Sequence, residues 1–395
     1  MGATTSPRLS GDAVAVLATA SGGAIANNYA LQPALVTIAH DLHATSESVS
    51  LVLTGAMVGY LLGLVFLVPL VDRVSPSILV PGQLVGLAVA LGLAAAMPST
   101  AALVSCFVAV GAMTTVAAEA TALVGKLVEA EVRGARMGVI AAGISAGILL
   151  SRLVGGALTG WLGWRPMLLS FALFCIAAAV VTRRVLPRQT PRDASSYFLT
   201  LRSIPGLLEL HPALRRSCAA GMLWFFAFNL IWVGISLRLA TPPYSLGPTT
   251  IGLYGLAGTL GLLVTRLAGR SADRYGTRRT MIIGLVTAVA GTASLAFSLG
   301  HPAWTVAGLA IFDAGCFAAQ VANQVVVVSL DRHRSGTLSS AYLILYYASG
   351  AVGTASAGLL LGALGWEALS LIATLAVAGA AGAVLFRLSP SLRSR

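Results

Sequence analysis

The sequence predicts an all-α polytopic membrane protein with twelve transmembrane helices in two six-helix halves. Its mean hydropathy of +0.88 over 395 residues is too high for a soluble domain, which needs far more polar surface to cover its core. About twelve apolar stretches each approach the ~20 residues that a helix needs to cross a bilayer. Landmarks of the first half also recur about 200 residues later, which indicates an internal duplication.

The twelve spans follow one another with short polar gaps. Their number and length distinguish them from buried helices of a soluble protein, and their Gly and Ala content is typical of helices that pack closely in lipid. Their approximate bounds are 13–38, 48–70, 77–97, 101–126, 136–161, 165–186, 217–240, 248–268, 280–299, 303–329, 337–364 and 367–387.

Arginine placement predicts the topology. With twelve spans, both tails and the even-numbered gaps share one side, and that side carries most of the arginines. The opposite gaps hold little beyond Arg165 and Arg238. This positive-inside bias places both termini in the cytoplasm and explains the net charge of +12 without nucleic-acid binding. Lys126 is the only lysine among 25 basic residues, which hints at a GC-rich bacterial genome and a bacterial cytoplasmic membrane.

Cysteine and histidine positions argue against a metal site and against an enzyme. The four cysteines lie far apart within spans, so neither a disulfide framework nor a zinc site is indicated. The five histidines fall in gaps or at span ends, and none forms the HExxH spacing of an intramembrane metalloprotease. We therefore expect no catalytic residues, no metal and no cofactor.

The duplication has a constant offset. Asp72-Arg73 and Asp273-Arg274 are 201 residues apart, and "LGWRP" at Leu162 and "LGWEA" at Leu364 are 202 apart. Residues 1–186 and 215–395 are therefore the predicted halves, and the polar stretch 187–214 is the predicted cytoplasmic linker.

Several motifs resemble the major facilitator superfamily over the whole chain, within its bacterial drug and metabolite efflux (drug:proton antiporter-like) branches. "GRSADRYGTRR" (Gly269–Arg279) is similar to the family's G-x-x-x-D-R-x-G-R-R loop, and "NNYALQPAL" to an efflux-subgroup string in span 1. The first-half copy, "VPLVDRVSP", lacks the leading Gly and the trailing Gly-Arg-Arg. Span 5 lacks the Gly-Pro-x-x-Gly-Gly string of many antiporters, and it carries an arginine there, so that motif does not indicate antiport.

The resemblance implies that the repeated loops gate the cytoplasmic side. Each aspartate would pair with arginines and with a helix N-terminus, whose partial positive charge favours a carboxylate. The expected gating residues are Asp72, Arg73, Asp273, Arg274 and Arg278. Spans 2, 5, 8 and 11 form the interface between the halves in this family, and glycines repeat within spans 5, 8 and 11, although close packing alone would explain such glycines equally well.

Three charged residues lie well inside predicted spans: Glu119, Arg152 and Asp313. Each costs roughly 2.5–3.5 kcal/mol on insertion scales, so each needs a reason. Their depths favour an Arg152–Asp313 pair over a Glu119–Arg152 pair. This pair could be a static link between the halves, or it could serve proton coupling or recognition of substrate charge. We favour Asp313 as the coupling acid, with Glu119 as a sensor of substrate charge or a second proton site.

Spans 1, 4, 7 and 10 line the central cavity in this superfamily. Span 7 is the most aromatic stretch, which suits a largely apolar ligand with a few polar anchors, although any single aromatic could equally serve packing or lipid contact. The expected cavity residues are Asn27, Asn28, Tyr29, Gln32, Trp224, Asn229, Trp232, Gln320, Asn323 and Gln324.

The predicted function is proton-coupled antiport that exports a small amphiphilic drug-like compound or metabolite by alternating access. An importer of a sugar or another metabolite on the same fold is the alternative. A receptor or scaffold that transports nothing would tolerate loss of the buried charges. We expect a monomer in the lipid bilayer, with a small-molecule substrate and protons as its partners.

Overall fold

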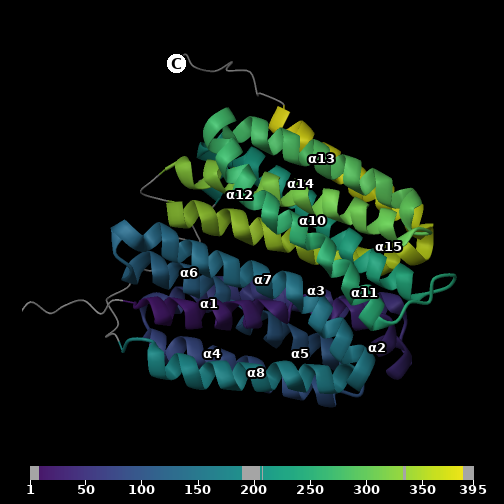
Figure 1. The fold of residues 1–395 in the computed structure, drawn as a ribbon, viewed down its shortest axis with the longest axis horizontal. Helices are drawn as coiled ribbons and strands as arrows, with labels where there is room; N and C mark the ends of the chain where they lie inside the picture. The colour runs from purple at the N-terminus through teal and green to yellow at the C-terminus, as the bar shows by residue number, and fades with distance from the viewer. Residues whose placement is uncertain (1–8, 189–204, 207, 332–334, 386–395) are drawn as a thin grey trace, which may run out of the picture. The chain divides into compact units, whose positions relative to one another are not determined.

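The computed structural model describes residues 9–188, 205–206, 208–331 and 335–385, and none of these lies in a β-strand. The helices group into two compact units (Figure 1). Unit 1 comprises Met1–Tyr197, Trp232–Leu256 and Thr354–Ala363, and unit 2 comprises Phe198–Ile231, Ala257–Gly353 and Leu364–Arg395. The division into halves at 186 and 215 stays a prediction.

Unit 1 contains the first six predicted spans and parts of later ones. Its elements are α1 (Gly11–Ala26), η1 (Gln32–Ala34), α2 (Leu35–Asp41), α3 (Ser46–Phe66), η2 (Val68–Asp72), α4 (Pro76–Ala96), α5 (Thr100–Met113), α6 (Val116–Leu127), α7 (Ala130–Leu162), α8 (Trp164–Val185) and α11 (Pro248–Tyr254). In Figure 1, α1 runs alongside α7, and α4 runs alongside α8, as their contacts also show.

Unit 2 holds the later helices. They are α10 (Pro212–Ala240), α12 (Gly258–Tyr275), α13 (Thr277–Ser298), α14 (Pro302–Ser329) and α15 (Ser335–Leu385), with η3 (Gly255–Ala257) at the unit boundary. The last turns of α10 and residues 354–363 of α15 belong to unit 1. Both α12 and α13 pack against α14.

These helices are consistent with twelve spans. Nine helical segments of the described chain are long and apolar enough to cross a membrane. One of them, Thr337–Leu385, bends at Gly365, where φ is 81°, and so supplies two spans. The shorter apolar helix α1 opens the first span. The run from α11 through η3 to α12 occupies the predicted eighth span.

The first and fourth spans are interrupted, which the sequence analysis did not foresee. After α1, the Asn27 side-chain amide donates to the Gly23 carbonyl at 2.9 Å, and Pro33 follows within η1. Between α5 and α6, the Thr114 hydroxyl donates to the Gly111 carbonyl at 2.7 Å and the Thr115 hydroxyl to the Ala112 carbonyl at 2.8 Å. Such side-chain bonds compete with the helix ladder and locally bend it.

Glycines allow two close helix contacts along α7. Gly143 and Gly147 face α1, where a Cβ would meet the backbone of Ala18 or Gly22. Gly156 instead faces α11, and a Cβ on its partner Gly252 would lie 2.6 Å from the Arg152 carbonyl oxygen. The glycines of span 5 therefore serve two neighbours: Gly143 and Gly147 allow close contact with α1, and Gly156 allows close contact with α11.

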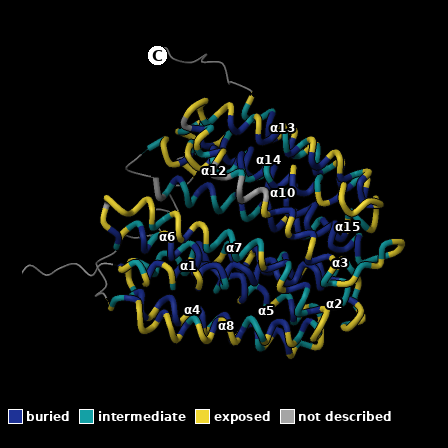
Figure 2. Tube along the Cα trace, in the orientation of Figure 1, coloured by how far each residue is buried: buried dark blue, intermediate teal, exposed yellow. Residues whose placement is uncertain are grey.

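Exposed residues lie along the outer helices (yellow in Figure 2). Many of them are large and apolar, as expected of surfaces in contact with lipid. Leu169, Leu173 and Ile176 of α8 are each about half exposed or more.

A single residue, Gly163, separates α7 from α8. Its φ of 94° is in the left-handed region that favours glycine.

Candidate functional site

Arg152 of α7 is enclosed by aromatic and amide side chains of unit 1. It is only 2% exposed. Its Nε donates to Gln32 Oε1 at 2.6 Å, and its guanidinium carbon lies 5.1 Å from the Tyr29 ring centre and 4.1 Å from that of Trp232. A desolvated cation over an aromatic face gains about 2 kcal/mol. Three predicted cavity residues therefore meet around one buried cation.

Glu119 of α6 is fully buried and faces an amide. Gln83 of α4 donates from Nε2 to Glu119 Oε1. Glu119 Oε2 has no hydrogen-bond partner within the described part of the chain, and no ion pair joins Glu119 to any described residue. Among the described residues, the carboxyl is therefore contacted by an amide and not by a cation.

The Asn27–Asn28 pair lies at the interruption of the first span. Both side chains are at most 2% exposed. Asn28 Oδ1 accepts from the Thr114 hydroxyl at 3.3 Å, which connects the interruptions of the first and fourth spans. The predicted cavity residues of span 1 are thus buried polar groups of unit 1.

In unit 2, Asn323 and Gln320 of α14 form one hydrogen-bonded network with Tyr342 of α15. Asn323 Nδ2 donates to the Ser217 carbonyl at 2.9 Å and to the Tyr342 hydroxyl at 3.3 Å. The Tyr342 hydroxyl donates to Gln320 Oε1 at 2.6 Å. Gln324 is exposed and lies outside this network.

Trp224 belongs to an aromatic cluster of α10 and α15. Its ring centre lies 5.2 Å from that of Tyr346, and Phe225 stacks on Tyr346 at 3.7 Å. Asn229 donates to the Phe225 carbonyl at 2.9 Å, so its amide completes a bond within α10. The cluster gives unit 2 an apolar aromatic wall with a few polar groups.

Asp313 lies on α14 in unit 2 and is 1% exposed, whereas Arg152 belongs to unit 1. Their predicted pairing stays a prediction. Both side chains are buried, and an ionised group at that depth is costly to leave without compensation.

Of the predicted gating residues, Asp72 has a defined partner. It forms an ion pair with Lys126 at the end of α6, and both side chains are about half exposed. The arginine partner expected from the resemblance is thus replaced by a lysine. Lys126 reaches η2 because α6 packs against it, and so it serves Asp72 rather than Glu119.

Arg73, Arg274 and Arg278 form no ion pair with an acid among the residues that the structure describes. Arg73 is exposed at the end of η2, and Arg274 lies over the Tyr275 ring at 5.3 Å. Arg278 donates to the carbonyls of Val384 and Leu385, at 3.3 and 2.9 Å. The side chain of Asp273 lies outside the described residues, so its gating role stays a prediction.

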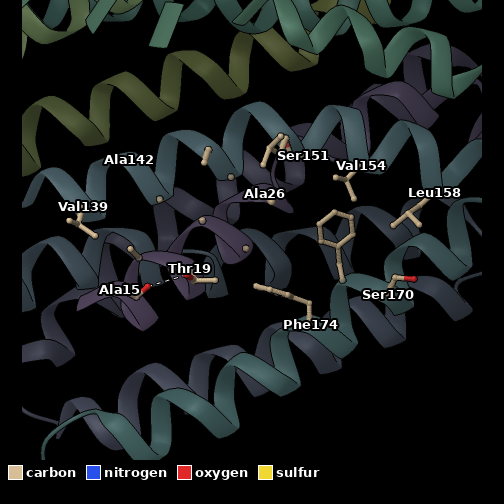
Figure 3. A pocket seen from close by; sticks show the side chains of 18 residues that line it. Ala15, Thr19, Ala26, Val139, Ala142, Ser151, Val154, Leu158, Ser170 and Phe174 are labelled. Atoms are coloured by element: carbon tan, nitrogen blue, oxygen red, sulfur yellow. Dashed lines mark hydrogen bonds between the residues drawn. The ribbon is translucent and has the colours of Figure 1, made fainter. Parts of the chain in front are cut away.

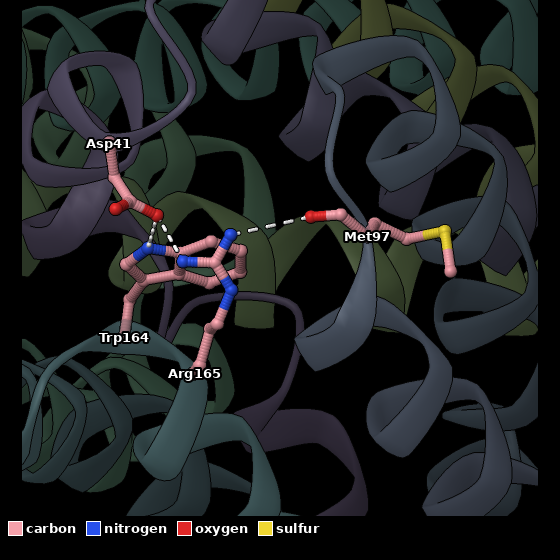
Figure 4. A network of polar contacts seen from close by, with 4 residues as sticks. All are labelled: Asp41, Met97, Trp164 and Arg165. Carbon is pink, nitrogen blue, oxygen red and sulfur yellow. Dashed lines mark hydrogen bonds and ion pairs between the residues drawn. The ribbon is translucent and has the colours of Figure 1, made fainter.

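A second polar cluster joins α2, α8 and the end of α4 (Figure 4). One oxygen of Asp41 accepts from the Trp164 indole at 3.0 Å and from Arg165. Arg165 also donates to the Met97 carbonyl at 3.5 Å and lies over the Trp164 ring. These hydrogen bonds, from Arg165 first and then Trp164, hold the pKa of Asp41 below its ordinary value of 3.8.

A cavity of about 680 Å³ lies between α1, α7 and α8 (Figure 3). Alanines, glycines and Phe174 line most of it, and none of the predicted cavity residues does. Its surface suits hydrocarbon rather than a polar ligand.

Sequence reasoning missed the residues that complete these sites. Gln83, Thr114 and Thr115 surround Glu119 and Asn28, and Tyr342 and Tyr346 complete the unit 2 clusters. Gln83 was the clearest available signal, because it is a lone amide in an otherwise apolar span. No group of three or more His, Cys, Asp or Glu side chains among the described residues could hold a metal ion.

The family model and the curated relatives that match this sequence all describe transporters. The model of the Major Facilitator Superfamily matches residues 17–354 and 218–395. An uncharacterized transporter, YgaY, of Escherichia coli O157:H7 is 29% identical over 354 residues, covering 90% of this chain and 89% of that protein. Probable transporter SCO4007 of Streptomyces coelicolor is 32% identical over 351 residues, covering 88% and 81%.

Solved structures share the fold. An inward-facing, unoccupied bacterial homologue of the human lysosomal transporter Spinster superposes with a TM-score of 0.74 at 14% identity, covering 94% of this chain and 93% of that one. The nucleoside transporter NupG gives 0.71 at 16% identity, covering 94% and 97%. Because the family model matches most of the sequence and the curated relatives are transporters, this chain belongs to the Major Facilitator Superfamily and is a multi-pass membrane transporter, not an enzyme.

Proposed function

We propose that this transporter exports a small amphiphilic drug-like compound or metabolite in exchange for protons, as in the drug efflux branches that its motifs resemble. It would act as a monomer in a bacterial cytoplasmic membrane, with both termini in the cytoplasm. Transport would proceed by alternating access, with a gate on the cytoplasmic side that includes Asp72 and Asp273.

The observation that carries the proposal is the burial of three charged residues in apolar spans. Glu119, Arg152 and Asp313 are 0%, 2% and 1% exposed. Charges at such depth are expensive, and in membrane proteins they commonly belong to substrate or proton pathways. An acid that gains and loses an arginine partner during the transport cycle would take up and release a proton. Asp313 and Arg152 are the proposed pair.

The character of the substrate is supported by the surroundings of these charges. Unit 2 offers the aromatic cluster around Trp224, and unit 1 places Tyr29 and Trp232 against Arg152. Aromatic faces with a few amides and one cation suit a ligand that is mostly apolar with some polar groups. Import of a sugar or another metabolite is the second candidate.

The test is transport by purified protein in vesicles with an imposed pH gradient. Drugs, dyes, sugars and amino acids are screened while a trapped pH dye reports proton movement. We expect an amphiphilic compound to move against the proton flow, and movement of a sugar together with protons would favour the importer instead.

Variants then identify the acid. Asp313→Asn should abolish gradient-driven accumulation but preserve gradient-independent exchange, whereas Asp12→Asn, an exposed acid of α1, serves as the matched control. Undiminished accumulation by Asp313→Asn, with the proton response intact, would exclude Asp313 as the coupling acid.

A further inference from the structure

Glu119 lies at one end of a row of buried polar residues whose middle members, Gln83, Thr115 and Thr114, belong to no predicted site. Gln83 donates to Glu119 Oε1, and the Thr115 hydroxyl lies 3.5 Å from Gln83 Oε1. The hydroxyl of the preceding residue, Thr114, donates to Asn28 Oδ1 at 3.3 Å. All five residues are at most 5% exposed. Hydrogen bonds thus join Glu119, Gln83 and Thr115 in one set and Thr114 and Asn28 in another, and the adjacent threonines bring the two sets together within unit 1.

The row passes through the interruption of the fourth span. Each of the two threonine hydroxyls has a single proton and two acceptors within reach. Thr115 can donate to the Ala112 carbonyl at 2.8 Å or to Gln83, and Thr114 can donate to the Gly111 carbonyl at 2.7 Å or to Asn28. A rotation of either hydroxyl thus exchanges a bond within the span for a bond along the row. Interrupted membrane helices are typical places for ion sites.

Gln83 determines which oxygen of the Glu119 carboxyl accepts a hydrogen bond. Its amide nitrogen faces Glu119 Oε1 while its amide oxygen faces Thr115, so the donor end of the amide points at the carboxyl. Glu119 Oε2 is buried and has no hydrogen-bond partner within the described part of the chain. A proton bound to the carboxyl would therefore reside on Oε2, and Oε1 would remain the carbonyl oxygen that accepts from Gln83.

Charged groups on the neighbouring elements form no described contact with Glu119. Elements α1, α4, η2 and α7 pack against α6, and α4 carries no ionisable residue. The charged residues of these elements and of α6 itself are Asp12, Asp72, Lys126, Glu131, Arg133, Arg136 and Arg152. Lys126 pairs with Asp72, Arg133 donates to the Val128 carbonyl, and Arg152 donates to Gln32. The amide of Gln83 is thus the group that contacts the Glu119 carboxyl.

We propose that Gln83 is a positioning residue that holds Glu119 for proton exchange, and that Thr115 connects this carboxyl to the bend of the fourth span. The proposal rests on proton coupling as the function. In the step itself, hydronium in the open pathway transfers a proton to Glu119 Oε2, leaving water, and the acid returns the proton to water after access has changed sides. Gln83 gains and loses no proton.

The test is infrared difference spectroscopy of the purified transporter in lipid, recorded between alkaline and acidic pH, without substrate. A protonated carboxyl gives a separate C=O stretch. We expect a band that Glu119→Gln removes. Gln83→Met, similar in length but without the donor, should keep the band and move it to higher frequency, because Oε1 no longer accepts a hydrogen bond. Thr115→Val should move it less, since Thr115 acts through Gln83.

The control is Thr121→Val, which removes a hydroxyl of α6 whose hydrogen bond, among the described residues, is to the Ala117 carbonyl of the same helix at 3.2 Å. This variant should leave the band in place. A band unaffected by Glu119→Gln, or one that Gln83→Met leaves at its original frequency, would overturn the proposal. Transport that proves independent of the proton gradient, with the band still lost and shifted as expected, would refute coupling and leave the positioning role of Gln83 in place.

Discussion

In the cluster of Asp41, Trp164 and Arg165, we expect Asp41→Ala to lower the free energy of unfolding more than Arg165→Met does. Trp164 is 3% exposed, and its indole N–H donates to Asp41 at 3.0 Å. In Asp41→Ala this buried donor loses its acceptor, which costs about 1–3 kcal/mol. Arg165 is 38% exposed, so in Arg165→Met the lost ion pair costs less than about 1 kcal/mol because water already screens it.

The free energy of unfolding, measured by detergent titration in mixed micelles, should therefore fall more for Asp41→Ala than for Arg165→Met. Asp41→Asn keeps an acceptor for the indole and should lie between them. Glu367→Ala is the matched control, because Glu367 is an exposed acid directly after Trp366, the repeat counterpart of Trp164. It should change stability by less than about 0.5 kcal/mol.

The same cluster has a pH signature. Because the hydrogen bonds lower the pKa of Asp41 in the folded state, its contribution is complete above the ordinary value of 3.8. The contribution disappears as pH falls through the lowered folded pKa. The stability difference between the native chain and Asp41→Ala should thus be constant near neutral pH and shrink in acid. An Arg165→Met variant as unstable as Asp41→Ala at neutral pH would refute the reasoning.

Two further predictions concern transport and packing. Asp72→Asn and Lys126→Gln should each weaken gradient-driven transport in vesicles without preventing membrane insertion. The double variant Asp72→Lys with Lys126→Asp, which exchanges the two charges, should recover part of the transport rate. Normal transport by both single variants would exclude a gating role for this ion pair. Gly156→Val should lose about 1–3 kcal/mol because the new side chain would meet the α11 backbone. Gly82→Ala, with nothing within 4 Å of the added Cβ, should be tolerated, and equal losses in the two glycine variants would contradict the close contact.

The spans were predictable because each is long and apolar, and the structure has helices at all of the predicted positions. Burial of Glu119, Arg152 and Asp313 was predictable from the free-energy cost of exposing a charged side chain to lipid. The partners were not, because sequence gives the depth of a residue but not the face of the helix on which it lies. Lys126 is two turns from Glu119 along α6, yet it pairs with Asp72.

The interruptions of the first and fourth spans had a weak signal in the doubled Asn27-Asn28 and Thr114-Thr115. Hydropathy does not detect them, since each pair is too short to divide an apolar window. Their importance depends on which side chains meet across helices, as Asn28 meets Thr114. Only the packed structure provides that information.

The turn at Gly163 and its repeat at Gly365 have a practical consequence for labelling the protein. One residue separates α7 from α8, and φ at both glycines, 94° and 81°, leaves no ordinary loop for an inserted epitope. The following indoles are each hydrogen-bonded, Trp164 to Asp41 and Trp366 to the Leu295 carbonyl. A tag at either turn would displace a tryptophan. The longer connection 241–247, between α10 and α11, is therefore the better place for an epitope or a fluorophore on that part of the transporter.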